Sequence, residues 1–520
     1  MWKKILENRF IILYVLPLSL GIFSVFSFQP FNLSFINILI LPILFLSIVY
    51  VRKSSMSIYR KKPYKKNLFL LGFTFGFGFY LSGVYWISYS LTFDDSFKFL
   101  IPFAVILIPL FLGLFTGITT LLVGQYLSYN VSSILLFSSS IALTDYVRGK
   151  VLSGFPWNVW GYSLSWMTEI LQILNLVGLF AFNLLAITIF TLPAIFFFRG
   201  NIYKKIIIIG STLIFIFFIY IYGTFTINKN KDMLINFDNK NKIYTKIISP
   251  NFELKYNLSI NEAKDKLKKL VRYSDPDPKK KTLFIWPEGV FTGYDFVEIS
   301  QFKDILKNNF TKNHLILFGI NTLNKKTGEH YNSLVVVDSN FEILSQYNKK
   351  KLVPFGEFLP FENILNKLGL KKITEGHGSF LKGKNQENIK IKNLNILPLI
   401  CYEIIFPELA QKADQKTNLI VNISEDGWFG NSIGPHQHFA KAIFRAVENN
   451  SFLVRSANKG ISAIISNKGE IFKQLDTNET GSIEINVPLF QNEHKNKNDL
   501  IFFILLFTYL TIFLIFKNKK

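Results

Sequence analysis

The stretch Leu397-Pro-Leu-Ile-Cys401-Tyr-Glu403 ends a short apolar run with the only cysteine in 520 residues. An apolar run of this length is typical of a buried strand, and the polar pair Tyr402-Glu403 indicates where that strand ends. A thiol at the end of a buried strand lies where an α/β sheet usually opens its binding site. A free cysteine is also among the most buried residue types and often only packs in the core. Cys401 is therefore a candidate nucleophile, and its interpretation depends on the rest of the chain.

The composition indicates a membrane protein. Hydrophobic residues make up 49% of the chain and charged residues only 18%, and the mean hydropathy is positive. The formal net charge of +23 is carried mostly by lysine. We take this charge to report orientation in a membrane, and we expect no nucleic-acid partner. A single cysteine excludes an internal disulfide and a multi-cysteine metal cluster, and no cofactor is expected.

Eight apolar stretches are candidates for membrane-spanning helices. A spanning helix needs about 20 mostly apolar residues. No small-residue cleavage site follows the first stretch, which predicts a retained helix and not a signal peptide. The predicted spans are residues 10–28, 35–51, 68–88, 99–122, 131–143, 170–198, 206–224 and 500–516.

Basic residues give these spans an orientation. The loop at residues 52–66 is rich in lysine and arginine, which is typical of a cytoplasmic loop. Counting eight spans from this loop places residues 154–157 and the long polar segment outside the cytoplasm. We therefore predict a transmembrane domain of about seven helices at 1–226, an extracytoplasmic domain at 227–499, and a C-terminal helix with a cytoplasmic tail at 500–520.

The long polar segment has the pattern of an α/β fold, because short β-rich runs alternate with amphipathic helices from residue 242 onward. The helices are expected at 261–273, 302–309 and 435–450. The strands are expected at 242–248, 282–286, 314–319, 332–337, 342–347, 395–400, 418–423, 452–457 and 462–465.

Three polar residues follow predicted strands in this segment: Glu288, Lys349 and Cys401. Together they supply a base, a cation and a nucleophile, which are the groups that acyl transfer through a thioester needs. A thiol with a pKa near 8.5 is only a few per cent thiolate at neutral pH, so a carboxylate base beside it would help. Taken singly, Glu288 could be a surface carboxylate at a turn, and Lys349 is one of three consecutive lysines.

The motifs around these residues resemble a known family. Trp286-Pro-Glu288, Tyr347-x-Lys349 with Leu352-Val-Pro-Phe-Gly-Glu357, and Cys401-Tyr-Glu403 resemble the Glu-Lys-Cys triad of the nitrilase superfamily. With the preceding membrane helices, they resemble the apolipoprotein N-acyltransferases in particular. The resemblance extends to Tyr331-Asn-Ser333, Trp428-Phe-Gly430, Gln437-His438, Arg445-Ala-x-Glu448 and Gly154-Phe-Pro-Trp157. It implies a multi-helix transmembrane bundle joined to an α/β nitrilase-like domain, an α-β-β-α sandwich.

The same resemblance implies an activity. Cys401 would take a fatty acyl chain from a membrane phospholipid as a thioester, with Glu288 as base and Lys349 supporting the oxyanion. The acyl chain would then pass to the α-amino group of the N-terminal diacylglyceryl cysteine of an apolipoprotein. The protein is expected to be a monomer in the cell inner membrane, with its catalytic domain on the periplasmic side and with the bilayer as a partner.

Further residues receive roles from the resemblance. Glu357, Glu403 and Asn332 would support the triad, and a backbone N–H near Tyr402 would assist Lys349. Trp157, Trp428 and Phe429 would contact substrate, although aromatic residues such as Trp157 also serve as interface anchors. The family's usual Asn-Asp-Ala before Trp-Phe-Gly is replaced by Glu425-Asp-Gly427, which makes the shape of that loop a point to test.

Several alternatives stay open at this stage. A membrane-tethered nitrilase-like amidase would resolve the thioester with water instead of an amine. A transporter or scaffold is a third class, but the predicted spans carry almost no charged residues. His436 and His438 could bind a metal, yet two ligands without a third favour a capping role at the start of a helix, and no metal site is expected. Arg445 and Glu448 are spaced for a structural ion pair on one helix.

Overall fold

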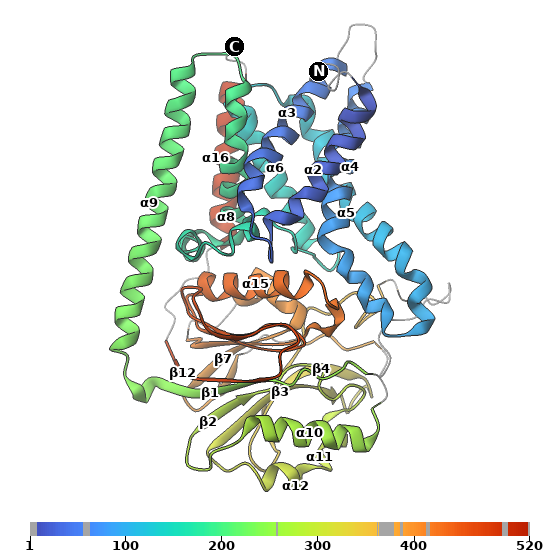
Figure 1. Cartoon of the computed structure of the whole chain (residues 1–520), viewed down its shortest axis with the longest axis vertical. Coiled ribbons are helices and arrows are strands. Elements are labelled where there is room, and N and C mark those ends of the chain that lie inside the picture. Colours follow the sequence, from blue (N-terminus) through green and yellow to red (C-terminus); the bar gives the residue numbers. More distant parts are fainter. Residues whose placement is uncertain are drawn as a thin grey trace. The chain divides into compact units, whose positions relative to one another are not determined.

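The chain divides into two compact units. Figure 1 shows the computed structural model, which describes residues 8–55, 63–255, 258–360, 362, 379–384, 388–411, 416–490 and 498–517. The helical unit comprises Met1–Ser88, Phe99–Thr226 and Lys497–Lys520. The α/β unit comprises Tyr89–Lys98 and Ile227–Asn496. The segment Tyr89–Lys98 therefore belongs to the α/β unit, although membrane helices flank it in the sequence.

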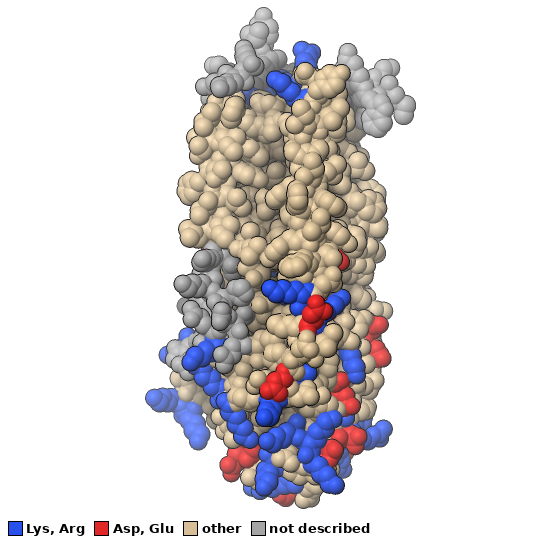
Figure 2. All heavy atoms as spheres, turned by 90° about the vertical axis from the view of Figure 1, so that its left-hand side faces the viewer, with Lys and Arg blue, Asp and Glu red and all other residues tan. Residues whose placement is uncertain are grey.

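Long apolar helices build the helical unit, and the protein is a membrane protein. Within the described residues, 6 helices are long and apolar enough to cross a membrane, and a shorter apolar helix covers Ile11–Ser27. On the face shown in Figure 2, charged side chains are nearly absent from the helical unit and crowd the surface of the α/β unit. The helices are α2 (Leu16–Phe23), α3 (Asn37–Ser55), α4 (Pro63–Val84), α5 (Ile101–Val123), α6 (Val131–Lys150), α7 (Thr168–Leu171), α8 (Leu174–Thr191), α9 (Ile202–Ile235) and α16 (Asn498–Phe516).

Helix α6 continues to Lys150, well beyond the end at residue 143 that the apolar pattern predicts. The added turns carry a buried ion pair, in which Arg148 Nη2 lies 2.8 Å from Asp145 Oδ1. Arg148 also donates to the carbonyl of Phe155 and so fixes the loop that contains Trp157. Because paired charges satisfy each other, the helix extends through residues that a hydropathy pattern reads as its end.

In the described part of the α/β unit, the strands form two six-stranded sheets, in the orders β12-β1-β2-β3-β4-β5 and β11-β10-β9-β8-β7-β6. In each sheet three neighbouring interior strands, β1-β2-β3 and β7-β8-β9, pair in parallel. The strands are β1 (Lys242–Ser249), β2 (Thr282–Ile285), β3 (His314–Leu323), β4 (His330–Val337), β5 (Ile343–Asn348), β6 (Ile389–Ile391), β7 (Leu394–Ile400), β8 (Leu419–Glu425), β9 (Leu453–Asn458), β10 (Ser462–Ile465), β11 (Ile471–Leu475) and β12 (Gly481–Pro488).

The two sheets pack face to face, with helices on both outer sides (Figure 1). One apolar core joins the inner faces and includes Ile285 and Leu317 of the first sheet and Ile400 and Ile423 of the second. A second core lies under α10 (Ile260–Ser274), α11 (Phe296–Ser300) and α12 (Lys303–Lys307). Helix α15 (Gly434–Glu448) contacts β9 and β10 from the other side. The prediction of a transmembrane bundle and an α-β-β-α sandwich in one chain is confirmed.

Local sequence signals explain where several elements begin. Helix α10 starts with a capping box, in which Ser259 accepts from the N–H of Glu262 and the Glu262 carboxylate accepts from the N–H of Ser259. Its apolar residues, including Leu267 and Leu270, face the first sheet. Most of β11 is exposed and β12 is only partly buried, so neither gives a clear apolar run, and the sequence pattern missed both.

Candidate active site

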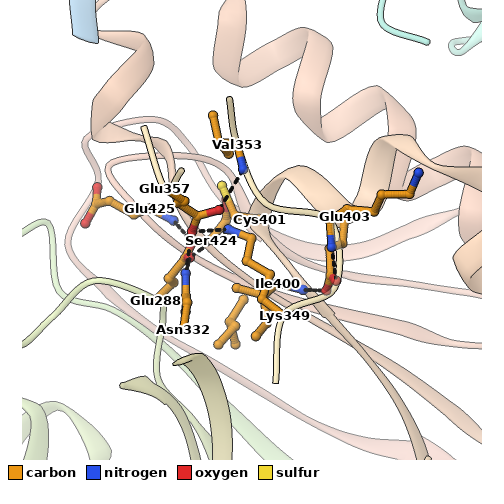
Figure 3. Close-up of polar contacts among 12 residues, drawn as sticks. Glu288, Asn332, Lys349, Val353, Glu357, Ile400, Cys401, Glu403, Ser424 and Glu425 are labelled. Atoms are coloured by element: carbon orange, nitrogen blue, oxygen red, sulfur yellow. Dashed lines mark hydrogen bonds and ion pairs between the residues drawn. The ribbon is translucent and has the colours of Figure 1, made fainter. Parts of the chain in front are cut away.

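The candidate site forms where strands of both sheets end. Glu288 follows β2, Lys349 follows β5, and Cys401 directly follows β7. Figure 3 shows the side chains of these residues, together with Glu357 and Asn332, turned toward one another. The strand that neighbours Glu288 comes very close, since a Cβ on Gly319 would lie 2.8 Å from the Glu288 Cα. Glycine at position 319 therefore permits Glu288 to sit beside β3.

Cys401 occupies a sharp turn between β7 and a short 3-10 helix, Cys401–Ile405. Its φ of 47° is left-handed, which a non-glycine residue adopts only where its surroundings hold it there. Such conformations concentrate at active sites. The residue is only 7% exposed, so its thiol lies in a mostly enclosed setting.

Lys349 and two carboxylates form a buried hydrogen-bonded cluster. The Lys349 Nζ donates to Glu357 Oε1 at 2.9 Å and to Glu288 Oε1 at 3.2 Å. Asn332 Nδ2 bridges the same two oxygens, at 2.7 Å from each. The second oxygen of Glu357 accepts from the Val353 N–H at 2.8 Å, as Figure 3 shows. The ammonium therefore has a fixed position between two acidic groups.

The charged groups around Cys401 have opposite effects on the pKa of its thiol. Burial raises the pKa of the Cys401 thiol well above its ordinary value, and the Glu288 carboxylate raises it further, while Lys349 lowers it. Burial alone would lower the pKa of Lys349, but Glu288 and Glu357 outweigh that effect and raise it. Lys349 therefore stays charged at neutral pH, and the resting thiol stays protonated. If a buried, protonated thiol of this kind is to attack a carbonyl, it needs a base, and Glu288 is the candidate that the sequence offers.

Glu403 holds the nucleophile turn against the lysine loop. Its Oε2 accepts from the Ile400 N–H at 2.9 Å, and its Oε1 accepts from the N–H groups of Lys350 and Lys351 at 2.7 and 3.2 Å. The hydroxyl of Tyr347 also donates to this carboxylate. Burial raises the pKa of Glu403, and the backbone N–H groups oppose that shift. The chain segments before Cys401 and after Lys349 are thereby joined.

The aromatic residues predicted to contact substrate lie in different places. Phe429 packs edge-on against His438, with ring centroids 5.2 Å apart, and Trp428 packs against Phe93 of the Tyr89–Lys98 segment at 5.3 Å. Tyr402 lies next to the nucleophile, and its ring contacts Phe406. Trp157 belongs to the helical unit, where it is 1% exposed and packs against Trp86.

Sequence reasoning missed the contacts behind the site. The N–H of Glu425 donates to Glu288 Oε2 at 3.2 Å, so the altered Glu-Asp-Gly loop touches the candidate base directly. Neither histidine is the predicted cap of α15: the N-cap residue is Ile433, and the N–H of Gly434 donates to Ser432 Oγ. His438 instead lies against Asp426 and the Cys401 carbonyl. The predicted ion pair between Arg445 and Glu448 is confirmed at 3.0 Å.

Comparison with known proteins agrees with the two-part architecture. Residues 259–491 match the family model for carbon-nitrogen hydrolases, and residues 20–192 match the model for the apolipoprotein N-acyltransferase N-terminal domain. The apolipoprotein N-acyltransferase of Rhodopseudomonas palustris is 30% identical over 490 residues, covering 91% of this chain and 89% of the relative.

The chain belongs to the apolipoprotein N-acyltransferase family. The enzyme of the same name from Bradyrhizobium diazoefficiens is likewise 30% identical, over 94% of this chain and 90% of the relative. Among solved structures, the carbon-nitrogen hydrolase of Helicobacter pylori superposes with a TM-score of 0.36 and 14% identity, covering 53% of this chain and 96% of that one. The protein is an acyltransferase of the nitrilase superfamily.

Proposed function

We propose that this protein transfers a fatty acyl chain from a membrane phospholipid to the N-terminal diacylglyceryl cysteine of apolipoproteins, through a thioester on Cys401. The observation that carries the proposal is the convergence of Glu288, Lys349 and Cys401 in a chain that also contains the family's membrane domain. The bilayer would deliver both substrates, since both carry acyl chains.

In the first half-reaction, Glu288 takes the thiol proton and Sγ attacks the ester carbonyl of the phospholipid. Lys349 stabilises the oxyanion that forms, with a backbone N–H near Tyr402 as a second donor. The carbon–oxygen bond of the ester then breaks, and Glu288 returns the proton to the departing lysophospholipid oxygen. The products are a Cys401 thioester and a lysophospholipid.

In the second half-reaction, the free α-amino group of the diacylglyceryl cysteine attacks the thioester carbonyl. A carbon–nitrogen bond forms and the carbon–sulfur bond breaks, while Glu288 moves a proton from the amine to Sγ. Glu357 and Asn332 support this chemistry by holding Lys349 and Glu288. We also propose that Trp428 and Phe429 contact the acyl substrates. We further propose that the enzyme acts as a monomer in the inner membrane, with residues 227–499 on the periplasmic side.

The test is intact-mass spectrometry of the purified protein after incubation with phospholipid. The unaltered protein should gain the mass of one acyl chain and lose it when a diacylated lipopeptide with a free amine is added. Cys401→Ser should gain no acyl mass and show no transfer, because a hydroxyl is far less acidic than a thiol. Full transfer by folded Cys401→Ser protein would refute the proposal, and release of free fatty acid instead of acylated peptide would favour an amidase-like hydrolase.

A further inference from the structure

His438 lies directly behind the nucleophile and has no role in the mechanism described so far. It is fully buried in α15, and its Nε2 is 3.2 Å from the backbone carbonyl oxygen of Cys401. A carbonyl oxygen can only accept a hydrogen bond, so Nε2 must carry a proton to make this contact. The histidine thus donates to the peptide that joins Cys401 to Tyr402.

The other ring nitrogen has partners for either protonation state. Nδ1 lies 2.9 Å from Asp426 Oδ1 and 3.1 Å from Arg455 Nη2. If Nδ1 is protonated it donates to Asp426, and if it is not it accepts from Arg455. Both states leave the proton on Nε2. A neutral ring that keeps its proton on Nε2 therefore accepts from Arg455 at Nδ1, whereas donation to Asp426 requires the doubly protonated, charged ring.

These partners are themselves fixed to the strands that carry the site. Asp426 accepts from Ser424 Oγ at 2.6 Å and from Arg455 Nη2 at 2.7 Å. Arg455, on β9, also donates to Asn422 on β8, whose Nδ2 donates to the Leu399 carbonyl of β7 at 2.9 Å. The three strands β7, β8 and β9 therefore all hold the network, and the imidazole cannot shift without disturbing them.

The orientation of the Cys401 carbonyl determines the direction of the next backbone N–H, that of Tyr402. A trans peptide is planar, with its C=O and N–H pointing in opposite directions. Fixing the Cys401 oxygen on the His438 side therefore fixes the direction of the Tyr402 N–H on the other side. The left-handed φ of 47° at Cys401 also needs outside contacts to keep it, and this hydrogen bond is one of them.

We propose that His438, held by Asp426 and Arg455, is a positioning residue that orients the Cys401–Tyr402 peptide for thioester formation. It touches no reacting atom and acts through the backbone of the nucleophile. The inference rests on the proposed function, because it assigns His438 to the acylation of Cys401.

The test uses two amide variants that each imitate one nitrogen of the ring. In His438→Gln the amide nitrogen lies near the place of Nε2 and can still donate to the Cys401 carbonyl. In His438→Asn the amide lies near the place of Nδ1 and can contact Asp426 but not Cys401. His436→Asn, on the same helix and not hydrogen-bonded to Asp426, Arg455 or the Cys401 carbonyl in the contacts described above, is the matched control. Each full-length protein is compared in thermal unfolding, in single-turnover thioester formation, and in alkylation of Cys401 by iodoacetamide.

We expect His438→Asn to form the thioester about 10- to 100-fold more slowly than the unaltered protein, because an oxyanion donor is misaligned but still present, and complete loss of one donor typically lowers a rate by about 10² or more. His438→Gln and His436→Asn should stay close to the unaltered rate. Alkylation of Cys401 needs no oxyanion donor, so all three variants should react with iodoacetamide like the unaltered protein. A purely structural role would instead lower the rates of both histidine-438 variants in proportion to their lost stability.

Thioester formation at the unaltered rate in folded His438→Asn would overturn the inference. An equal loss in the two His438 variants would also overturn it. If His438→Asn does not fold, His438→Gln decides alone. A folded His438→Gln protein that forms the thioester about 10- to 100-fold more slowly than the unaltered protein would contradict the proposed role. If the unaltered protein forms no thioester, the proposed function is refuted, and that result is distinct from a failure of the positioning role of His438.

Discussion

Glu288 has two opposite effects on Cys401. As the proposed base it accepts the thiol proton during attack, yet its resting negative charge raises the pKa of the same thiol. Lys349 has the reverse effect at rest, since its positive charge lowers that pKa. In the proposed mechanism the buried thiol therefore stays protonated at rest and loses its proton only as the acyl carbonyl arrives. Removing the carboxylate of Glu288 and removing the ammonium of Lys349 should therefore change the alkylation rate of Cys401 in opposite directions.

Glu288→Gln should separate the reactivity of the thiol from catalysis. Removing the carboxylate charge lowers the pKa of Cys401 toward its ordinary value, so iodoacetamide should alkylate the variant faster than the unaltered protein at neutral pH. Thioester formation from phospholipid should fall by about 10² or more, because general base catalysis is lost. Intact-mass measurements of both reactions check this. Thioester formation at the unaltered rate would move the base elsewhere, with Glu357 and Glu403 the first candidates.

Lys349→Met should change both reactions in the same direction. Without the ammonium the pKa of Cys401 rises further, so alkylation should slow. Thioester formation should fall by about 10² or more, since the oxyanion loses its charged donor. The same two mass measurements apply, with Lys350→Met, the neighbouring lysine in the chain, as the control. Faster alkylation of Lys349→Met would show that the lysine does not act on the thiol as its position indicates.

At the scale of elements, a run of apolar residues in the sequence predicts a buried strand. The sequence pattern does not predict which other strands that strand pairs with. The apolar run before Cys401 identifies β7, and similar runs identify β2 and β8. β12 stays hidden because only three of its eight residues are buried, yet it pairs with β1 across the whole strand. Likewise, Glu288 and Cys401 can be proposed from motifs, but the placement of His438 behind Cys401 depends on how α15 packs on β9 and β10.

Gly319→Ala tests the close approach of β3 to the segment that carries Glu288. The added Cβ would lie 2.8 Å from the Glu288 Cα and 2.9 Å from Ile423 Cδ1, so backbone must move. We expect a loss of about 1–3 kcal/mol in the free energy of unfolding, as for other overpacked cores. Thioester formation should slow as Glu288 is displaced. Thermal unfolding and the acylation assay measure the two effects.

The matched control is Gly210→Ala in α9, where the added methyl group meets nothing within 4 Å. This variant should keep both stability and activity. If Gly319→Ala is as stable and as active as the control, the position of Glu288 tolerates a larger neighbour than its backbone contacts indicate.

At the scale of the whole molecule, the membrane and the α/β unit together determine which substrates the site can meet. A phospholipid and a diacylated apolipoprotein reach the enzyme through the bilayer, so the side on which the α/β unit lies decides which leaflet and which proteins supply them. Helices α4, α5, α6, α8 and α9 lie between the basic loop at residues 52–66 and the start of the α/β chain. If each crosses the membrane, the loop and the α/β unit lie on opposite sides, and the basic loop is expected on the cytoplasmic side.

The single cysteine makes this orientation directly measurable. In a Cys401→Ser background the protein contains no cysteine, so one introduced thiol at an exposed site reports one location. Lys240→Cys should react with a membrane-impermeant maleimide in intact spheroplasts. Lys65→Cys and Lys517→Cys should react only after the membrane is permeabilised, because the basic loop and the end of α16 are expected inside. Labelling of Lys65→Cys but not Lys240→Cys in intact spheroplasts would place the α/β unit in the cytoplasm, where it could not act on lipoproteins at the outer leaflet.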